Sequence, residues 1–301
     1  MTRIQWTERT WNPVVGCTKV SEGCLHCYAE PLARRFQGIA NFKGGDKKTQ
    51  HVVLHPERLE VPLKVKKPTL WFVNSMSDLF HEEVPFDFID RVLAVIALTP
   101  WHTYQVLTKR PERMQLYFSE SREKEWDKVW TNLSSSSEGR LWLSGSPSWP
   151  LPNLWLGVSV ENQKWAERRI PLLLGTPATV RFVSYEPALT AVDFKKWLPR
   201  RIPCEGYCSC DRYFEYAHGQ RCINDDGPCL NWAIVGGESG PKARPFDLVW
   251  MRQTLAQCRA AGVPVFYKQG GATNACSHDR KGGHFDCFPD DLKVREFPNT
   301  I

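Results

Sequence analysis

Three cysteines near the amino terminus have the residue type and spacing of a metal-binding loop. Cys17, Cys24 and Cys27 lie in the run GCTKVSEGCLHCYAE, with the pattern C-x6-C-x2-C and no fourth cysteine nearby. Three thiolates suit a [4Fe–4S] cluster that leaves one iron open for a substrate or cofactor, whereas a structural zinc ion takes four protein ligands. A glycine directly precedes Cys17 and another precedes Cys24, which lets the backbone bend tightly around an inorganic core. We therefore expect an open iron–sulfur site; the alternatives are zinc completed by His26 or a distant residue, and three unrelated thiols.

A second group of cysteines lies in the polar, turn-rich stretch 195–231, which has few large apolar side chains of its own. Such a segment cannot fold by burial alone, and a bound metal is a common substitute for a core. We expect zinc bound by four of the five cysteines, with an auxiliary iron–sulfur cluster and free or redox-active thiols as alternatives. The five are Cys204, Cys208, Cys210, Cys222 and Cys229, with His218 between them.

A weaker pattern of the same kind, CSHDRKGGHFDC, occupies residues 276–287 near the carboxyl terminus. It contains Cys276, His278, His284 and Cys287. We interpret it as a surface loop in which these residue types occur incidentally.

The segments that must position these ligands alternate between short apolar runs and amphipathic stretches. Most of the runs are near-continuous in hydrophobicity, as in parallel strands that are buried on both faces. Repeated strand–helix units predict an α/β fold with a parallel sheet, which is either doubly wound or a full or partial (β/α) barrel. We favour the barrel. It would form one domain over residues 1–301, with the cysteine-rich segment 195–231 as an insertion. Predicted strands cover 69–74, 103–107, 154–160, 180–184, 232–236 and 264–268, with another near 11–16. Predicted helices cover 86–98, 111–118, 162–174 and 246–261, a further helix runs from Ala29 to Phe36, and 119–153 reads as a loop or lid.

Polar residues directly follow each of the predicted strands. One such residue could be a helix cap, but six groups in succession at the same point are hard to explain as caps. Since a (β/α) protein builds its site from the carboxyl ends of its strands, we expect these residues to converge beside the cysteine loop. They are Ser75, Ser77, Asp78 and His81, then Thr108, Lys109 and Arg110, then Ser159 and Glu161, Ser184 and Glu186, Glu238 and Ser239, and Lys268 and Gln269.

Composition narrows the cellular setting and the class of partner. The first residues, MTRIQWTERTWNP, contain no apolar signal-peptide core, so we expect a cytoplasmic protein, where cysteine clusters are more often metal ligands than disulfides. The longest apolar stretch, 92–101, is too short to cross a bilayer, so no membrane partner is expected. The net charge of +6 and the basic segments 43–48, 64–67 and 195–201 are compatible with a nucleic acid or nucleotide partner.

Seven motifs along most of the chain carry a resemblance to a known family. They are WNPVVGCTKVSEGCLHCYAE, NSMSDLFHEEVP, LTKRPERM, LGVSVENQKWAERRIPLL, RFVSYEPAL, VGGESGPKARP and FYKQGG. With them the chain resembles an uncharacterised phage and prophage protein family, described as radical-SAM-like for its amino-terminal three-cysteine motif. Radical SAM enzymes most often use C-x3-C-x2-C, whereas the first gap here is six residues, and the insertion at 195–231 does not map onto the shared pattern.

The resemblance implies a specific cofactor chemistry. Cys17, Cys24 and Cys27 would bind three irons of a [4Fe–4S] cluster, and S-adenosylmethionine (SAM) would bind the fourth. An electron donor would then drive its cleavage to methionine and a 5′-deoxyadenosyl radical. The residues expected to bind the cofactor are Tyr28, Ser75, Ser77, Asp78, Lys109, Ser159, Glu161, Glu186 and Glu238, with Arg110 and Arg244 as further cations for phosphates or the SAM carboxylate.

The leading expectation is a radical SAM-type enzyme that modifies a nucleic acid or nucleotide. A radical SAM enzyme acting on a protein or peptide is one alternative. Another belongs to a different class: a metal-stabilised nucleic-acid-binding protein whose cluster is structural or senses redox state. A zinc hydrolase is disfavoured, because no histidine cluster at the strand ends accompanies the cysteines.

Overall fold

The computed structural model describes residues 4–32, 52–119, 149–199, 201–203, 221–223, 227–240, 242–271, 274–275, 277–279 and 281–299, with only the backbone described for 201–203 and 221–223. Within this part no helix is long and apolar enough to cross a membrane.

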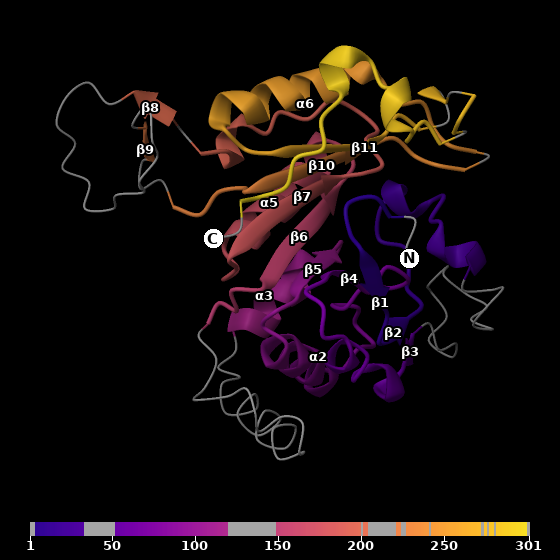
Figure 1. Ribbon diagram of the computed structural model, residues 1–301, viewed down its shortest axis with the longest axis vertical. Coiled ribbons are helices and arrows are strands. Elements are labelled where there is room, and N and C mark those ends of the chain that lie inside the picture. Colours follow the sequence, from indigo (N-terminus) through magenta and orange to yellow (C-terminus); the bar gives the residue numbers. More distant parts are fainter. Residues whose placement is uncertain are drawn as a thin grey trace.

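The centre of the molecule is a parallel sheet of seven strands that curls into a half-barrel (Figure 1). The strands lie in the order β1-β4-β5-β6-β7-β10-β11, so each strand of the sheet pairs with the next one along the chain. The sheet is therefore wound in one direction, as in a barrel, and not doubly wound. The bounds are β1 Arg9–Trp11, β4 Leu70–Val73, β5 Thr103–Thr108, β6 Leu154–Val160, β7 Val180–Tyr185, β10 Trp232–Gly236 and β11 Val265–Gln269. The predicted parallel sheet and partial barrel are confirmed at this level.

Within the described residues, four α-helices lie between the strands and cover one face of the sheet. They are α2 Phe86–Leu98, α3 Pro111–Ser119, α5 Gln163–Leu174 and α6 Leu248–Ala261. Local chemistry sets their ends: Asn162 caps α5 by accepting from the Trp165 N–H, and Gly262 ends α6 at φ 69°. Their apolar sides join the outer faces of the strands in one large core, which includes Val92, Ala166 and Leu255 from the helices.

The inner face of the sheet changes character along the strands. Its lower part is a separate aromatic cluster to which Trp155, Phe182 and Trp232 contribute, closed by Trp6. Because every second residue of a strand shares a face, the rows that begin with Trp155, Phe182 and Trp232 continue into small residues and then into carboxylates just beyond the strand ends. The small residues are Gly157 and Ser159 in β6, Ser184 in β7 and Gly236 in β10, and the carboxylates that follow are Glu161, Glu186 and Glu238. The aromatic cluster thus forms a floor below the polar strand ends.

The predicted strand near 11–16 is two short strands with different partners. β1 pairs with β4 in the main sheet, while β2 Val14–Val15 pairs antiparallel with β3 Val53–Leu54. Pro13 lies between them and has no N–H to donate to a continuous ladder. This break turns the chain out of the sheet immediately before the first cysteine.

The remaining elements are short. β8 Arg201–Pro203 and β9 Arg221–Ile223 form an antiparallel pair in the insertion. Residues 29–32 begin the predicted helix, whereas 33–36, the loop segment 120–148 and residues 204–220 lie outside the described residues. The 3-10 turns in the described part of the chain are η1 Glu22–Cys24, η2 Pro56–Arg58, η3 Pro62–Lys64, η4 Lys195–Trp197, η6 Phe285–Cys287 and η7 Asp290–Leu292.

Replacing Gly157 by alanine tests the packing of the inner face. A Cβ at this position would lie 2.5 Å from the ring of Phe182, which is fully buried and cannot move freely. We expect Gly157→Ala to lower the free energy of unfolding by about 1–3 kcal/mol, the usual cost of overpacking. Urea unfolding measures this as a lower midpoint at unchanged slope.

Gly236→Ala is the matched control, because its Cβ would meet no atom closer than 3.4 Å on the same face. Equal stability of the two variants would show that Phe182 does not close the floor as described.

Candidate functional site

The three amino-terminal cysteines lie on one loop that leaves β2 beside the carboxyl ends of the strands. Gly16 begins the loop at φ 94°, a backbone conformation that favours glycine, and its N–H donates to the Met76 carbonyl at 3.1 Å. Cys17, Cys24 and Cys27 are half-buried free thiols, and Cys24 ends the turn η1. The loop buries little apolar surface, so polar contacts must hold it.

The sulfurs are not grouped as they would be around one ion. Around a single tetrahedral zinc, bonds of 2.3 Å place the sulfurs about 3.8 Å apart. The ligand atoms of Cys17, Cys24 and Cys27 do not all lie within 4.8 Å of one another. Among the described residues, His278, His284 and Cys287 do meet this limit.

Asp78 and Arg110 anchor the start of the loop. Asp78 accepts from Thr108 Oγ1 at 2.7 Å and from Arg110 Nη1 at 3.3 Å. The same Arg110 nitrogen lies 3.4 Å from the Cys17 sulfur, and Nη2 donates to the Thr18 carbonyl at 3.0 Å. The carboxylate therefore orients the arginine, and the arginine holds the loop.

Glu161 and Arg169 anchor its middle and are fully buried, at 0% and 1% exposure. They form an ion pair at 3.0 Å, and Ser21 of the loop donates to Glu161 at 2.8 Å. A Cβ on Gly23 would lie 2.3 Å from a Glu161 oxygen, so only glycine fits there. The Arg169 guanidinium stacks on Trp165, 4.1 Å from the ring centroid.

Glu238 and Arg244 anchor the end of the loop. Arg244 Nη2 donates to Glu238 at 2.6 Å and to the Glu22 carbonyl at 2.9 Å, while His26 Nδ1 lies 3.0 Å from Glu238 Oε2. Burial alone would raise the pKa of Glu238, but the hydrogen bonds from Arg244 and His26 outweigh it and lower the pKa to about 2. Three carboxylate–arginine pairs therefore hold the cysteine loop. Asp78 and Arg110 follow β4 and β5, Glu161 follows β6 and pairs with Arg169 of α5, and Glu238 and Arg244 follow β10.

The thiols differ in their electrostatic surroundings. Burial raises the pKa of Cys17 to about 12, despite the nearby Arg110 charge. Burial also raises the pKa of Cys27. At Cys24 burial acts in the same direction, but the charge of Lys109 and hydrogen bonds from the loop backbone outweigh it, so its pKa is lowered. Cys24 is the thiol that ionises most readily.

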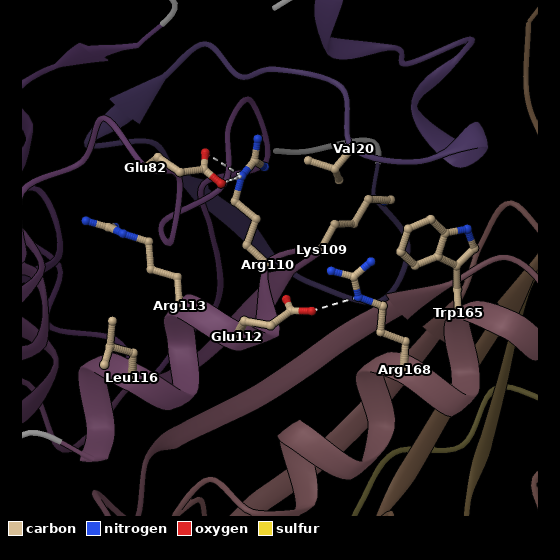
Figure 2. A pocket seen from close by; sticks show the side chains of 9 residues that line it. All are labelled: Val20, Glu82, Lys109, Arg110, Glu112, Arg113, Leu116, Trp165 and Arg168. Atoms are coloured by element: carbon tan, nitrogen blue, oxygen red, sulfur yellow. Dashed lines mark hydrogen bonds and ion pairs between the residues drawn. The ribbon is translucent and has the colours of Figure 1, made fainter.

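A cleft of about 400 Å³ opens beside the loop, between Val20 and the helices α3 and α5 (Figure 2). Figure 2 shows Glu82 bonded to Arg110 and Glu112 bonded to Arg168 across it. Arg113 also lines the cleft and donates to backbone carbonyls. Lys109 faces the same space and, within the described part of the chain, its ammonium has no carboxylate partner.

Three of the residues predicted for cofactor binding join the amino-terminal segment to β4 and the turn after it. Tyr28 donates to the Ser75 carbonyl at 2.7 Å. The Ser75 hydroxyl donates to Asn12 at 3.1 Å, and the Ser77 hydroxyl donates to the Val14 carbonyl at 2.8 Å. The serines therefore dock this segment onto the sheet.

Ser159 and Glu186 complete the predicted set at the strand ends. Ser159 is buried and its carbonyl accepts from Arg169 at 2.8 Å. Glu186 is half-buried and forms an ion pair with Lys268 from β11. Of the residues predicted to converge, His81, Arg110, Glu161 and Glu238 bond to the cysteine loop. Arg169 and the contact of His26 with Glu238 were not anticipated. Arg169 lies in the middle of the amphipathic stretch 162–174, and no local pattern there indicates its partner.

Most of the predicted zinc ligands in the insertion cannot be placed. Cys204, Cys208, Cys210 and His218 lie outside the described residues, and only the backbone of Cys222 is described, paired with Ile202. Cys229 is a half-buried free thiol whose pKa is raised by burial. Cys276 also lies outside the described residues.

Comparison with known proteins assigns the chain to a family. A family model described as protein of unknown function (DUF5131) matches residues 1–288. The chain belongs to this family. No curated protein and no solved structure matches the chain. The family assignment brings no activity with it, so the function has to be argued from the site.

The Glu238 contacts predict a specific pH dependence of stability. A carboxylate whose pKa is lowered from 4.5 to about 2 in the folded state stabilises the fold above pH 4.5, and this contribution disappears as the pH falls toward 2. Glu238→Gln should therefore cost about 1–3 kcal/mol at pH 7 and progressively less in acid. Urea unfolding of both proteins between pH 2 and 7 measures the difference.

Glu112→Gln provides the control, because its ion pair with Arg168 is solvent-exposed and should be worth at most about 1 kcal/mol. A Glu238→Gln deficit that stayed constant with pH would contradict the lowered pKa.

Proposed function

We propose that this protein is an iron–sulfur enzyme of the radical SAM type that acts on a nucleic acid or nucleotide. The observation that carries the proposal is the cysteine loop: three half-buried thiols at the carboxyl edge of a curled parallel sheet, gripped by three carboxylate–arginine pairs. In a parallel (β/α) architecture this edge is where active sites form.

The donor set fits an open cluster better than a structural zinc ion. Three cysteines share the loop, and their sulfurs do not all lie within 4.8 Å of one another, as they would around a single zinc ion. A cluster held by three thiolates keeps one iron accessible. When bound, such a cluster supplies an electron for the cleavage of SAM and hence a carbon-centred radical.

The protein's own residues would hold and tune this centre. Arg110 places an N–H 3.4 Å from the Cys17 sulfur, and hydrogen bonds to sulfur influence the reduction potential of a cluster. Glu161 and Glu238 bond to arginines and to the loop, and Asp78 orients Arg110, which bonds to the loop. We therefore assign the three carboxylates to positioning the loop and not to contacting the cofactor. Lys109 remains as the cation beside the thiols that could bind a carboxylate or phosphate.

The cleft supports an anionic substrate. Its volume of about 400 Å³ lies within the range of small-molecule sites, and four cationic side chains line it against two carboxylates. Phosphate groups are recognised by such arginine and lysine side chains. A nucleotide, or one nucleotide of a nucleic acid, matches both the size and the charge.

Anaerobic reconstitution with iron and sulfide tests the enzyme. We expect cluster absorbance and a paramagnetic signal that changes when SAM is added, followed by release of 5′-deoxyadenosine after chemical reduction. Cys17→Ser, Cys24→Ser and Cys27→Ser should each abolish both signals, whereas Cys258→Ala should retain them because Cys258 is buried in α6 away from the loop.

Lys109→Met separates anion binding from cluster assembly. It should keep its iron and weaken the affinity for SAM or for a nucleotide by about tenfold or more, because one charge-assisted contact is lost. Lys64→Met is the control, since Lys64 is exposed and paired with Glu60. A protein that binds no iron refutes the proposal; one that binds a cluster but never cleaves SAM favours a structural or redox-sensing cluster.

A further inference from the structure

A second candidate metal site lies far along the chain from the cysteine loop, in the segment after β11. His278, His284 and Cys287 place one ligand atom each within 4.8 Å of one another. The sequence pattern alone suggested incidental residues, but their convergence in space is an observation that the sequence could not provide. None of the three contributes to the carboxylate–arginine pairs or to the cleft.

The distances match a tetrahedral ion. Zinc bonds of about 2.0–2.1 Å to histidine nitrogen and 2.3 Å to sulfur require the two atoms to lie about 3.5 Å apart. His278 Nδ1 is 3.5 Å and His284 Nδ1 is 3.9 Å from the Cys287 sulfur. The two imidazole rings stack with centroids 5.0 Å apart.

The loop that carries the histidines is held in place by contacts that need no metal. Asp279 accepts from the N–H groups of Lys281 and Gly283, at 2.9 and 2.8 Å. The Gly283 carbonyl, next to His284, accepts from Arg295 at 2.8 Å and from Gln5 at 3.0 Å. A ligand set on a fixed loop loses less entropy when an ion binds.

Charge and exposure also favour a cation. Asp286 Oδ2 lies 3.9 Å from His284 Nδ1 and adds negative charge beside the site. His278 and His284 are exposed and Cys287 is half-buried, so an ion can enter from solvent. Two imidazoles and one thiolate are a donor set that suits zinc.

The redox state of Cys287 decides whether the site can bind. Cys287 is disulfide-bonded, and a disulfide sulfur is not a thiolate ligand. We propose that His278, His284 and Cys287 bind a zinc ion once this disulfide has been reduced. A dithiol supplies the two electrons and two protons that convert the disulfide to two thiols and is itself oxidised to a disulfide. Zinc then displaces the proton of the Cys287 thiol to solvent, and water or another ligand takes the fourth position.

Zinc and cobalt titrations of the full chain test this site. Dithiol-reduced wild-type protein should bind one equivalent more zinc than the His278→Ala/His284→Ala variant. With Co²⁺, the tetrahedral and sulfur-to-cobalt absorption bands of the variant should be weaker than those of the wild type by the amount that one bound equivalent contributes. Untreated wild-type protein should lack this equivalent. His55→Ala is the control, because His55 pairs with Glu57 elsewhere. Equal stoichiometry in wild type and double variant overturns the proposal.

Two further readouts keep the result interpretable. If the double variant does not fold, zinc-induced shifts of the His278 and His284 ring protons in reduced wild-type protein decide the matter, and unshifted signals overturn it. Iron content and SAM cleavage should be unchanged in a folded double variant. The zinc site can therefore fail while the iron–sulfur proposal stands, and the reverse is equally possible.

Discussion

The structure depends on a polar loop that cannot hold itself by burial. Between Gly16 and Ala29 the chain contributes almost nothing to the main core. Three carboxylate–arginine pairs at the strand ends supply the missing constraint. Each pair contains a buried carboxylate, and each connects a different part of the sheet to a different part of the loop. Removing one partner of such a pair leaves a buried charge uncompensated, which destabilises the part of the loop that the pair holds.

The curled sheet makes these contacts possible. Because its strands follow one another in order and run parallel, their carboxyl ends form one continuous edge. The alternation of faces along each strand then puts aromatic residues at the bottom and carboxylates at the top of the same rows. The rigid aromatic floor fixes where Glu161 and Glu238 emerge, and these in turn fix where the loop can lie.

The positive charges at this edge of the sheet differ in whether a carboxylate neutralises them. The arginines are neutralised by their carboxylates, whereas Lys109 faces the thiols and the cleft without such a partner among the described residues. The site therefore separates charges that hold the protein together from a charge that is available to a ligand. In the sequence both kinds of charge look alike, because each is a charged residue that follows a strand.

Local patterns were sufficient to predict the parallel strands, the helices α2, α3, α5 and α6, and the grouping of polar residues at one edge, because hydrophobic periodicity and strand polarity act over a few residues. The sequence also determined the three-cysteine loop and the position of its glycines.

Only the tertiary structure decided the partners of Glu161 and Glu238, the docking role of Ser75 and Ser77, and the convergence of His278, His284 and Cys287. Ser21 and Glu161 are 140 residues apart, and His26 and Glu238 are 212 apart. Contacts at such separations are set by how the sheet curls, and no local pattern encodes them.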